Sequence, residues 1–253
     1  MLIFLFIFAL FIFLTVASAF SFREFFSRIT GNAIVDSEIL GNYKFEDNLN
    51  NEKGGSAIPF GSPVYVSGKS GKAVSLDGID DYISLPQISP MKGTLSLWVK
   101  FNSSILIDNN GYVILGFGNT GGDQNYMDLR KTLGNEMVFR YRRNGIDYEA
   151  KRPKMDGADS WHYYTATWTA SELKIYIDGV LIGTKEKTPD VIPSLSQSRI
   201  GSRGFQAPGL YFKGEVDELM IFSQALTEAQ IKEMYETYLP AQPICGNIII
   251  ETG

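Results

Sequence analysis

Alternating apolar and polar positions run through most of the chain between residues 39 and 240 and predict β-strands. From Gly93 to Phe101, alternate positions carry the apolar residues Leu95, Leu97, Val99 and Phe101. Successive side chains of a strand point to opposite faces, so this set is expected to face a core. Asn144-Gly145 and Asp178-Gly179 interrupt such runs and favour two-residue hairpin turns, because both central residues accept positive φ.

Helical spacing of apolar residues occurs in one stretch, Thr227 to Tyr238, near the end of the chain. Thr227 is suited to be its N-cap, and Gln230 completes a capping box. Many short strands with a single helix at the end predict an all-β, antiparallel, two-sheet β-sandwich with one short C-terminal helix.

The stretch from Gly214 to Phe222 leads directly into this helix and is expected to form a regular strand. Regular alternation puts Asp217 on one face with Leu219 and Ile221. It puts Glu218 on the other face with Val216, Met220 and Phe222. At least one of these faces is core, and a buried carboxylate must be paired, hydrogen-bonded or bound to a metal.

The first residues read as an export signal. Met1 to Phe20 is almost entirely apolar, and Ala17-Ser18-Ala19 has the small-x-small form of a signal-peptidase site. We predict a signal peptide over residues 1–19, a spacer over 20–38, and an extracellular or cell-surface location. The alternative is an uncleaved signal anchor, which would be the chain's only contact with a membrane.

Composition narrows the classes of function. The 253 residues carry a net charge of −5, without a basic tract that would indicate nucleic-acid binding. One cysteine and one histidine exclude a Cys/His zinc site and an internal disulfide framework.

Six sequence blocks in order resemble the laminin G-like, concanavalin A-like jelly-roll domains. They are YKFEDNLNN (43–51), GKSGKAVSLDGIDDYISLP (68–86), TLSLWVKF (94–101), WHYYTATWTASELKIYIDGVLIG (161–183), IGSRG (200–204) and GEVDELMIFSQALTEAQIKEMY (214–235). The resemblance implies one jelly-roll domain over residues 39–240, with one concave sheet and a second sheet closed by the last strand and helix.

The C-terminal end has a second resemblance. CGNIIIETG (245–253) is similar to the opening of small cysteine-rich disulfide repeats, which implies that 241–253 is a linker and the start of a truncated repeat. The alternative is an unpaired tail cysteine at Cys245.

The laminin G-like resemblance also implies a structural Ca²⁺, with Glu46 and Asp217 as its carboxylate ligands. In the alternative, Asp217 accepts backbone N–H bonds and Glu46 is solvated. A further acidic group, Asp77, Asp80 and Asp81, is expected to cap N–H groups of a turn.

For ligand binding we select Tyr126, Arg140 and Tyr148. Sugar sites combine aromatic rings with hydrogen-bonding side chains, and on the strand from Met137 to Arg142 the side chains of Arg140 and Arg142 share one face. The alternative is that the tyrosines are core or cross-strand partners.

The sequence is compatible with three functions. We predict a non-catalytic module that binds a glycan or a surface protein, within a larger multidomain protein; the alternative is a structural or adhesive spacer. The third is a glycoside hydrolase, whose laminarinase-type motif has three carboxylates at alternating positions. Here Glu215 and Asp217 fill two positions but Leu219 fills the third. Since a retaining glycosidase needs two carboxyl groups about 5 Å apart, we predict no enzyme activity.

Overall fold

The computed structural model describes residues 38–87, 91–106, 110–119, 122–152, 157–187, 195–203 and 210–239. The expected signal peptide over residues 1–19, nearly all of the spacer, and the C-terminal segment 241–253 with Cys245 lie outside these residues. In the part of the chain that is described, no helix combines the length and apolar character needed to cross a membrane.

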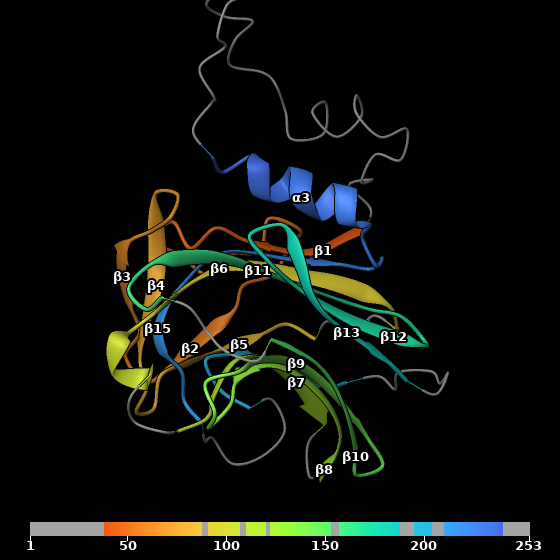
Figure 1. Cartoon of the computed structure of the whole chain (residues 1–253). Coiled ribbons are helices and arrows are strands. Elements are labelled where there is room, and N and C mark those ends of the chain that lie inside the picture. Colours follow the sequence, from red (N-terminus) through yellow and green to blue (C-terminus); the bar gives the residue numbers. More distant parts are fainter. Residues whose placement is uncertain are drawn as a thin grey trace, which may run out of the picture.

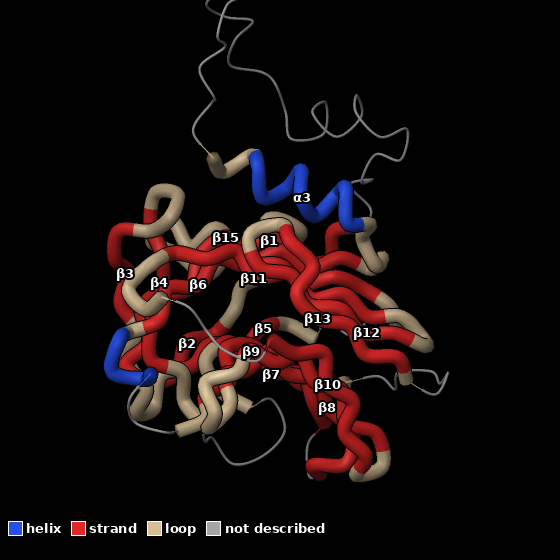
Figure 2. The backbone as a smooth tube through the Cα atoms, viewed as in Figure 1, coloured by secondary structure: helices blue, strands red, loops and turns tan. Residues whose placement is uncertain are grey.

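Two antiparallel sheets lie one above the other, and we call them the upper and lower sheets from their places in Figure 1. The upper sheet has the order β13 (Val180–Glu186), β12 (Glu172–Ile177), β11 (Trp161–Trp168), β6 (Gly93–Phe101), β15 (Lys213–Phe222), β4 (Lys72–Asp77) and β3 (Val64–Ser67), with β1 (Ile39–Tyr43) also paired to β15. The lower sheet has the order β10 (Ile146–Arg152), β9 (Met137–Arg143), β8 (Gly122–Lys131), β7 (Tyr112–Asn119), β14 (Gln197–Ile200), β5 (Tyr82–Leu85) and β2 (Ile58–Phe60). Figure 2 shows the two layers of strands and, on the upper one, helix α3 (Glu228–Glu236); a 3₁₀ turn, η2, spans Ser103–Leu106. The predicted two-sheet β-sandwich with one C-terminal helix is confirmed.

The main core fills the space between the sheets. The apolar set on β6 faces it, as its alternation predicts, and all four side chains are fully or almost fully buried: Leu95, Leu97, Val99 and Phe101. Trp98, on the opposite face of β6, belongs to a second core between the upper sheet and α3. The upper sheet is therefore covered on both faces, whereas no described helix lies on the outer face of the lower sheet (Figure 1).

The predicted hairpin turns are also confirmed. Asn144 and Gly145 have φ of 49° and 81° between β9 and β10, and Asp178 and Gly179 have φ of 51° and 77° between β12 and β13. At the far edge of the lower sheet, β2 has Pro59 at its centre, and all three of its residues are exposed. Proline is tolerated in a sheet at such an edge, where its missing N–H does not interrupt an inner ladder.

Helix α3 begins at the predicted cap. The Thr227 hydroxyl accepts the Gln230 N–H at 3.3 Å, and the Gln230 side-chain oxygen accepts the Thr227 N–H at 2.8 Å. The helix covers the second core with Ile231 and Met234, which pack with Leu226. Both halves of the capping box are present, so the N–H groups of Thr227 and Gln230 both have acceptors.

We expect Thr227→Ala to lower the free energy of unfolding by about 1 kcal/mol, because the substitution leaves the Gln230 N–H without its acceptor. Urea titration of the variant against the parent chain measures this. Thr227→Ser keeps the hydroxyl and serves as the control; a loss as large as that of Thr227→Ala would contradict the capping role.

The prediction that side chains alternate regularly along β15 is wrong at the centre of the strand. Asp217 pairs with Trp98 of β6 and Met220 with Ser96, so β15 has one residue more than β6 between these pairs. Glu218 is the extra residue of this β-bulge and has a φ of 49°. Beyond it, each side chain of β15 faces opposite to the predicted direction.

The bulge reassigns the faces of the carboxylates. Val216, Leu219 and Ile221 all face the core between the sheets, whereas Met220 and Phe222 face α3. Asp217 is therefore on the outer side of the upper sheet with Trp98, its direct partner on β6, and not with Leu219 and Ile221.

Candidate functional site

The outer face of the lower sheet carries the densest group of polar and aromatic side chains that the sequence singled out. On β9, Met137, Phe139 and Tyr141 belong to the core between the sheets. The intervening residues, Arg140 among them, therefore lie on the outer face, as the alternation predicts. We call this surface the outer face and describe it from β10 towards β2.

Two arginine–carboxylate pairs occupy the β8–β10 end of the outer face. Arg140 donates to Asp128 from Nε at 3.2 Å and from Nη2 at 2.6 Å, and Asp128 is fully buried. Arg142 donates to Asp147 from Nε at 2.6 Å and from Nη2 at 2.7 Å. Two-point pairing of this kind holds each guanidinium plane in one orientation.

These pairs also set the charge states. Burial alone would lower the pKa of the Arg140 guanidinium, but Asp128 outweighs it and the pKa lies above its usual range. Burial would raise the pKa of the Asp147 carboxyl, but the bond from Arg142 and the charge of Arg140 hold it below its usual range. The Asp147 carboxylate is thus kept ionised and is poorly suited to act as a general acid.

Tyr126 lies beneath these arginines. The guanidinium carbons of Arg140 and Arg142 are 4.6 and 5.4 Å from its ring centroid, and the residue is 2 % exposed. The ring therefore supports the guanidinium groups by cation–π contact and does not offer its face to a sugar in this arrangement.

Tyr148 is not part of this group. It pairs with Tyr141 across β9 and β10, with ring centroids 6.3 Å apart, and packs against the core between the sheets. Because Asp147 lies on the outer face opposite Arg142, the next residue along the strand must point inward. Of the three predicted ligand residues, the structure brings together Tyr126 and Arg140 and places Tyr148 on the other side of the sheet.

In the middle of the outer face, strand β7 contributes two glycines and therefore no side chains. Gly118 pairs with Tyr126 and Gly116 with Asp128 on one side, and the same glycines pair with Gln197 and Arg199 of β14 on the other. Neither glycine has a side chain that projects from the sheet, and both residues are buried in this arrangement. We call this strip the glycine floor.

Aromatic rings occupy the β2–β5 end of the outer face. The rings of Phe60 and Tyr82 stack with centroids 4.5 Å apart and planes 3° apart, and Tyr211 follows at 6.4 Å from Tyr82. The Arg199 guanidinium lies 5.0 Å from the Tyr82 ring centroid. Phe60 is 42 % exposed, so this aromatic end, unlike Tyr126, can offer ring surface to a ligand.

Alternation within the sequence indicates one residue of the aromatic end, Tyr82, but not its partner Phe60. In Tyr82–Leu85, Ile83 and Leu85 face the core, so Tyr82 must face outward. Its partner Phe60 lies on a three-residue strand with a central proline, which periodicity does not detect.

Asp217 and Glu46 both point to the loop between β3 and β4. Asp217 Oδ2 accepts the N–H groups of Lys69 and Ser70 at 2.9 and 3.0 Å, and its Oδ1 accepts the Glu218 N–H at 2.8 Å. The Glu46 carboxylate accepts the Lys72 N–H at 3.2 and 3.3 Å.

These contacts bear on the calcium prediction. A cation needs oxygen donors around it, whereas both carboxylates here face N–H groups, which repel a cation. In this arrangement the residues do not fit a calcium ion and match the alternative in which Asp217 accepts backbone hydrogen bonds. Calcium binding at Glu46 and Asp217 therefore stays a prediction.

The acidic group at the β4–β5 turn is used by the backbone, as predicted. Asp81 accepts the N–H groups of Ser62 and Asp77 at 2.6 and 3.0 Å, and Asp77 accepts that of Ile79 at 2.7 Å. Asp77, Asp80 and Asp81 are the one group of three or more acidic, His or Cys residues in the described chain with ligand atoms within 4.8 Å of one another. Their contacts identify a capped turn.

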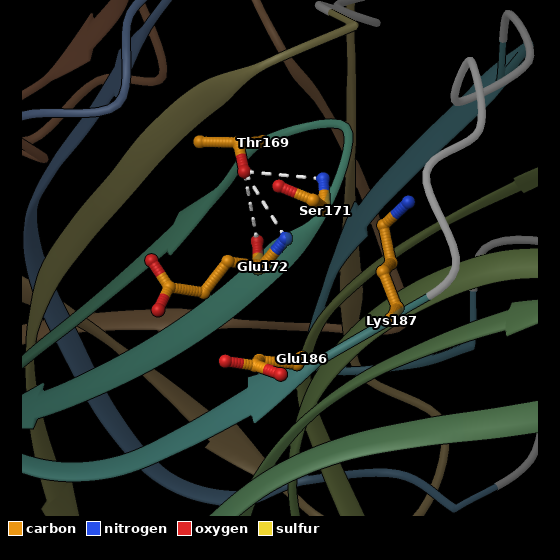
Figure 3. Close-up of a pocket in the computed structure, with 5 residues that line it drawn as sticks. All are labelled: Thr169, Ser171, Glu172, Glu186 and Lys187. Atoms are coloured by element: carbon orange, nitrogen blue, oxygen red, sulfur yellow. Dashed lines mark hydrogen bonds between the residues drawn. The ribbon is translucent and has the colours of Figure 1, made fainter.

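An open hollow of about 470 Å³ lies beside the turn between β11 and β12 (Figure 3). The Thr169 hydroxyl accepts the N–H groups of Ser171 and Glu172 at 3.3 and 3.1 Å. Figure 3 shows the Lys187 side chain pointing away from Glu172 and Glu186, and its ammonium donates to the Ala170 carbonyl. The polar groups here close the turn, and the hollow contains no residue of the outer face.

The three positions of the hydrolase motif do not share one face of β15. Glu215 faces away from the main core and pairs with Lys100 at 2.5 Å, Asp217 accepts backbone N–H bonds, and Leu219 is buried between the sheets. None of the three lies on the outer face of the lower sheet.

Two stacked antiparallel sheets, one of them with polar and aromatic side chains on its outer face, define a jelly-roll domain. The family model described as concanavalin A-like lectin/glucanases superfamily, of laminin G type, matches residues 77–232. The chain belongs to this superfamily, as the sequence blocks predict.

Solved structures agree on the fold. Domain 4 of AbnA, a GH43 extracellular arabinanase from Geobacillus stearothermophilus, in complex with arabinotriose, has a TM-score of 0.65 and 22% identity, covering 78% of this chain and 98% of that one. The receptor binding domain of a botulinum neurotoxin C/D mosaic serotype has a TM-score of 0.66 and 15% identity. The match covers 80% of this chain and 52% of that one. The binding domain of Paraclostridial Mosquitocidal Protein 1 has a TM-score of 0.63 and 16% identity, over 80% of this chain and 52% of that one. No curated protein sequence matches the chain.

Proposed function

We propose that this protein is an exported, non-catalytic recognition module that binds a glycan chain along the outer face of its lower sheet. One observation carries the proposal: a stacked pair of rings with Phe60 exposed lies at one end of this face, and oriented arginine–carboxylate pairs lie at the other, with the Arg142–Asp147 pair partly exposed. Sugar rings offer an apolar face to aromatic rings and hydroxyls to polar groups, so an extended glycan matches both ends.

The fold supports this placement. The outer face lies opposite α3, and Arg140 and Arg142 are already held by Asp128 and Asp147, which reduces the side-chain entropy lost when a ligand binds. An arabinotriose complex of a similar fold, and the toxin binding domains, support recognition of a sugar or a surface receptor. Export rests on the predicted signal peptide over residues 1–19.

A glycan array probed with the full chain is the first test, and we expect retention on one class of polysaccharide. Phe60→Ala should weaken that binding roughly 3- to 10-fold, because it removes one exposed stacking ring. Affinity electrophoresis or calorimetry measures the change.

Val180→Ala is the matched control, since Val180 is 64 % exposed on the upper sheet, away from the outer face. Equal losses for both variants would contradict binding on the outer face. Silence across neutral and charged polysaccharides would contradict glycan recognition and favour the structural spacer.

A further inference from the structure

The outer face is more basic than the protein as a whole. The chain has a net charge of −5, yet basic side chains outnumber acidic ones on this face. Strand parity and cross-strand pairing place these basic residues on or beside the outer face: Arg130, Arg140, Arg142, Lys151, Arg199 and Arg203. The acidic residues that the same pairing places there are Asp128, Asp147 and Glu149, and Glu136 lies beside them, 3.5 Å from the Lys151 ammonium.

Arg130 differs from the two paired arginines beside it. It lies on β8, two residues beyond Asp128, and pairs with Val113 of β7 and Val138 of β9. Its Nε is buried and has no hydrogen-bond partner among the described residues. The nearest acid, Asp128, is engaged on both oxygens by Arg140. A buried guanidinium N–H without an acceptor is costly, and a ligand oxygen that displaces the groups covering it would satisfy it.

The charges around Arg130 also favour the approach of an anion. Burial lowers the pKa of the Arg130 guanidinium, Asp128 opposes this, and the charges of Arg140 and Arg203 lower the pKa further. A negatively charged group at this position would reverse these effects, because it offsets the repulsion between the neighbouring cations.

Arg199 stands across the glycine floor from these residues. It pairs with Gly116, whose other partner is Asp128, and its guanidinium donates to the Arg203 carbonyl at 3.1 Å and to the Gln197 side-chain oxygen at 3.4 Å. A chain that leaves the aromatic end therefore passes Arg199 before it reaches Arg130.

We propose that the glycan bound on the outer face is anionic, and that Arg130 takes the carboxylate or sulfate group of one of its sugars. The guanidinium fork matches both oxyanions with two parallel N–H···O bonds, which a neutral sugar hydroxyl cannot accept in the same way. This inference rests on the proposed glycan function and names its substrate class.

The test measures binding of the full chain to four polymers. Polygalacturonate and its fully methyl-esterified form share a backbone and differ in charge, and dextran sulfate and dextran do the same for sulfate. We expect one charged polymer to bind at least roughly 10-fold more tightly than its neutral form, which identifies the source of the oxyanion.

Arg130→Gln should remove most of that preference, while Arg130→Lys, which keeps the charge but not the fork, should retain part of it. Lys232→Gln removes the same charge from an exposed site on α3, 69 % exposed, and should leave binding unchanged. The unfolding midpoint of each variant confirms that it is folded.

The outcomes separate the two proposals. Equal binding of charged and neutral forms, or of Arg130→Gln and the parent, overturns the anionic ligand and leaves glycan recognition standing. Equal losses in Arg130→Gln and Lys232→Gln overturn the role of Arg130, because net charge alone then explains binding. Binding to no polysaccharide in the array contradicts the function itself.

Discussion

Asp128→Asn is expected to lower the free energy of unfolding by about 3 kcal/mol, since it leaves the Arg140 guanidinium buried without its counter-charge. Asp128 is fully buried and the Arg140 side chain is 7 % exposed, so water cannot replace the lost partner. Asp147 lies 3.7 Å from Arg140 Nη1 and limits the loss. Urea unfolding of the variant and the parent chain measures the difference.

Two further variants test whether the uncompensated charge of Arg140 causes this loss of stability. Asp147→Asn breaks the more exposed pair with Arg142 and should cost about 1 kcal/mol or less. The double substitution Asp128→Leu with Arg140→Met removes both buried charges and should recover most of the stability. A double variant as unstable as Asp128→Asn would contradict the view that the uncompensated charge causes the loss.

The second large effect concerns pH and the buried Asp217. Burial raises the pKa of the Asp217 carboxyl to about 7, against the lowering effect of the N–H bonds from Ser70, Glu218 and Lys69. In the unfolded chain the same group titrates near its usual value, about 3.9. Between about pH 4 and pH 7 the folded chain therefore holds a proton that the unfolded chain has lost.

Stability is thus expected to fall as pH rises from about 4 to 7 and to change little from this source above 7. The full effect of Asp217 is about 4 kcal/mol, and burial of Glu218, whose pKa is also raised, acts in the same direction. Unfolding midpoints measured from pH 5 to pH 8 should decline in the parent chain.

Asp217→Asn cannot ionise and should decline less over this range, although it loses one acceptor for the Glu218 N–H at every pH. Asp147→Asn is the control: the pKa of that carboxyl is lowered, so its contribution is lost only as pH falls below about 4. A decline of equal slope in Asp217→Asn and the parent would refute the assignment to Asp217.

The same series tests the calcium prediction. A cation at Asp217 would stabilise its ionised form, so added Ca²⁺ should raise the midpoint at pH 8 more than at pH 5. Identical curves with Ca²⁺ and with a chelator would leave Asp217 as a hydrogen-bonded core acid.

The parts of the fold that the sequence predicts depend on rules that act over a few residues. The alternation of β6, the Asp178-Gly179 turn and the capping box at Thr227 each follow from neighbouring residues alone. The bulge at Glu218 does not, because a glutamate at positive φ is stabilised by partners distant in sequence, such as the β3–β4 loop that binds Asp217.

In the candidate site, too, some features follow from neighbouring residues and others depend on partners distant in sequence. Strand parity predicts that Arg140 and Arg142 share a face, and the structure confirms it. Parity cannot predict that both guanidinium groups cover Tyr126, because the contact depends on the register between β8 and β9. The pairing of Phe60 with Tyr82 joins residues 22 positions apart through a strand too short for periodicity to detect.

Pro59 has a consequence for self-association. Edge strands expose N–H and C=O groups that recruit further strands, and a short edge with a central proline is a poor template for such pairing. The strand that carries Phe60 is therefore protected from edge-to-edge dimerisation, which would bury the aromatic rings between two copies. The proline leaves the exposed ring of Phe60 in solvent without making this edge a template for aggregation.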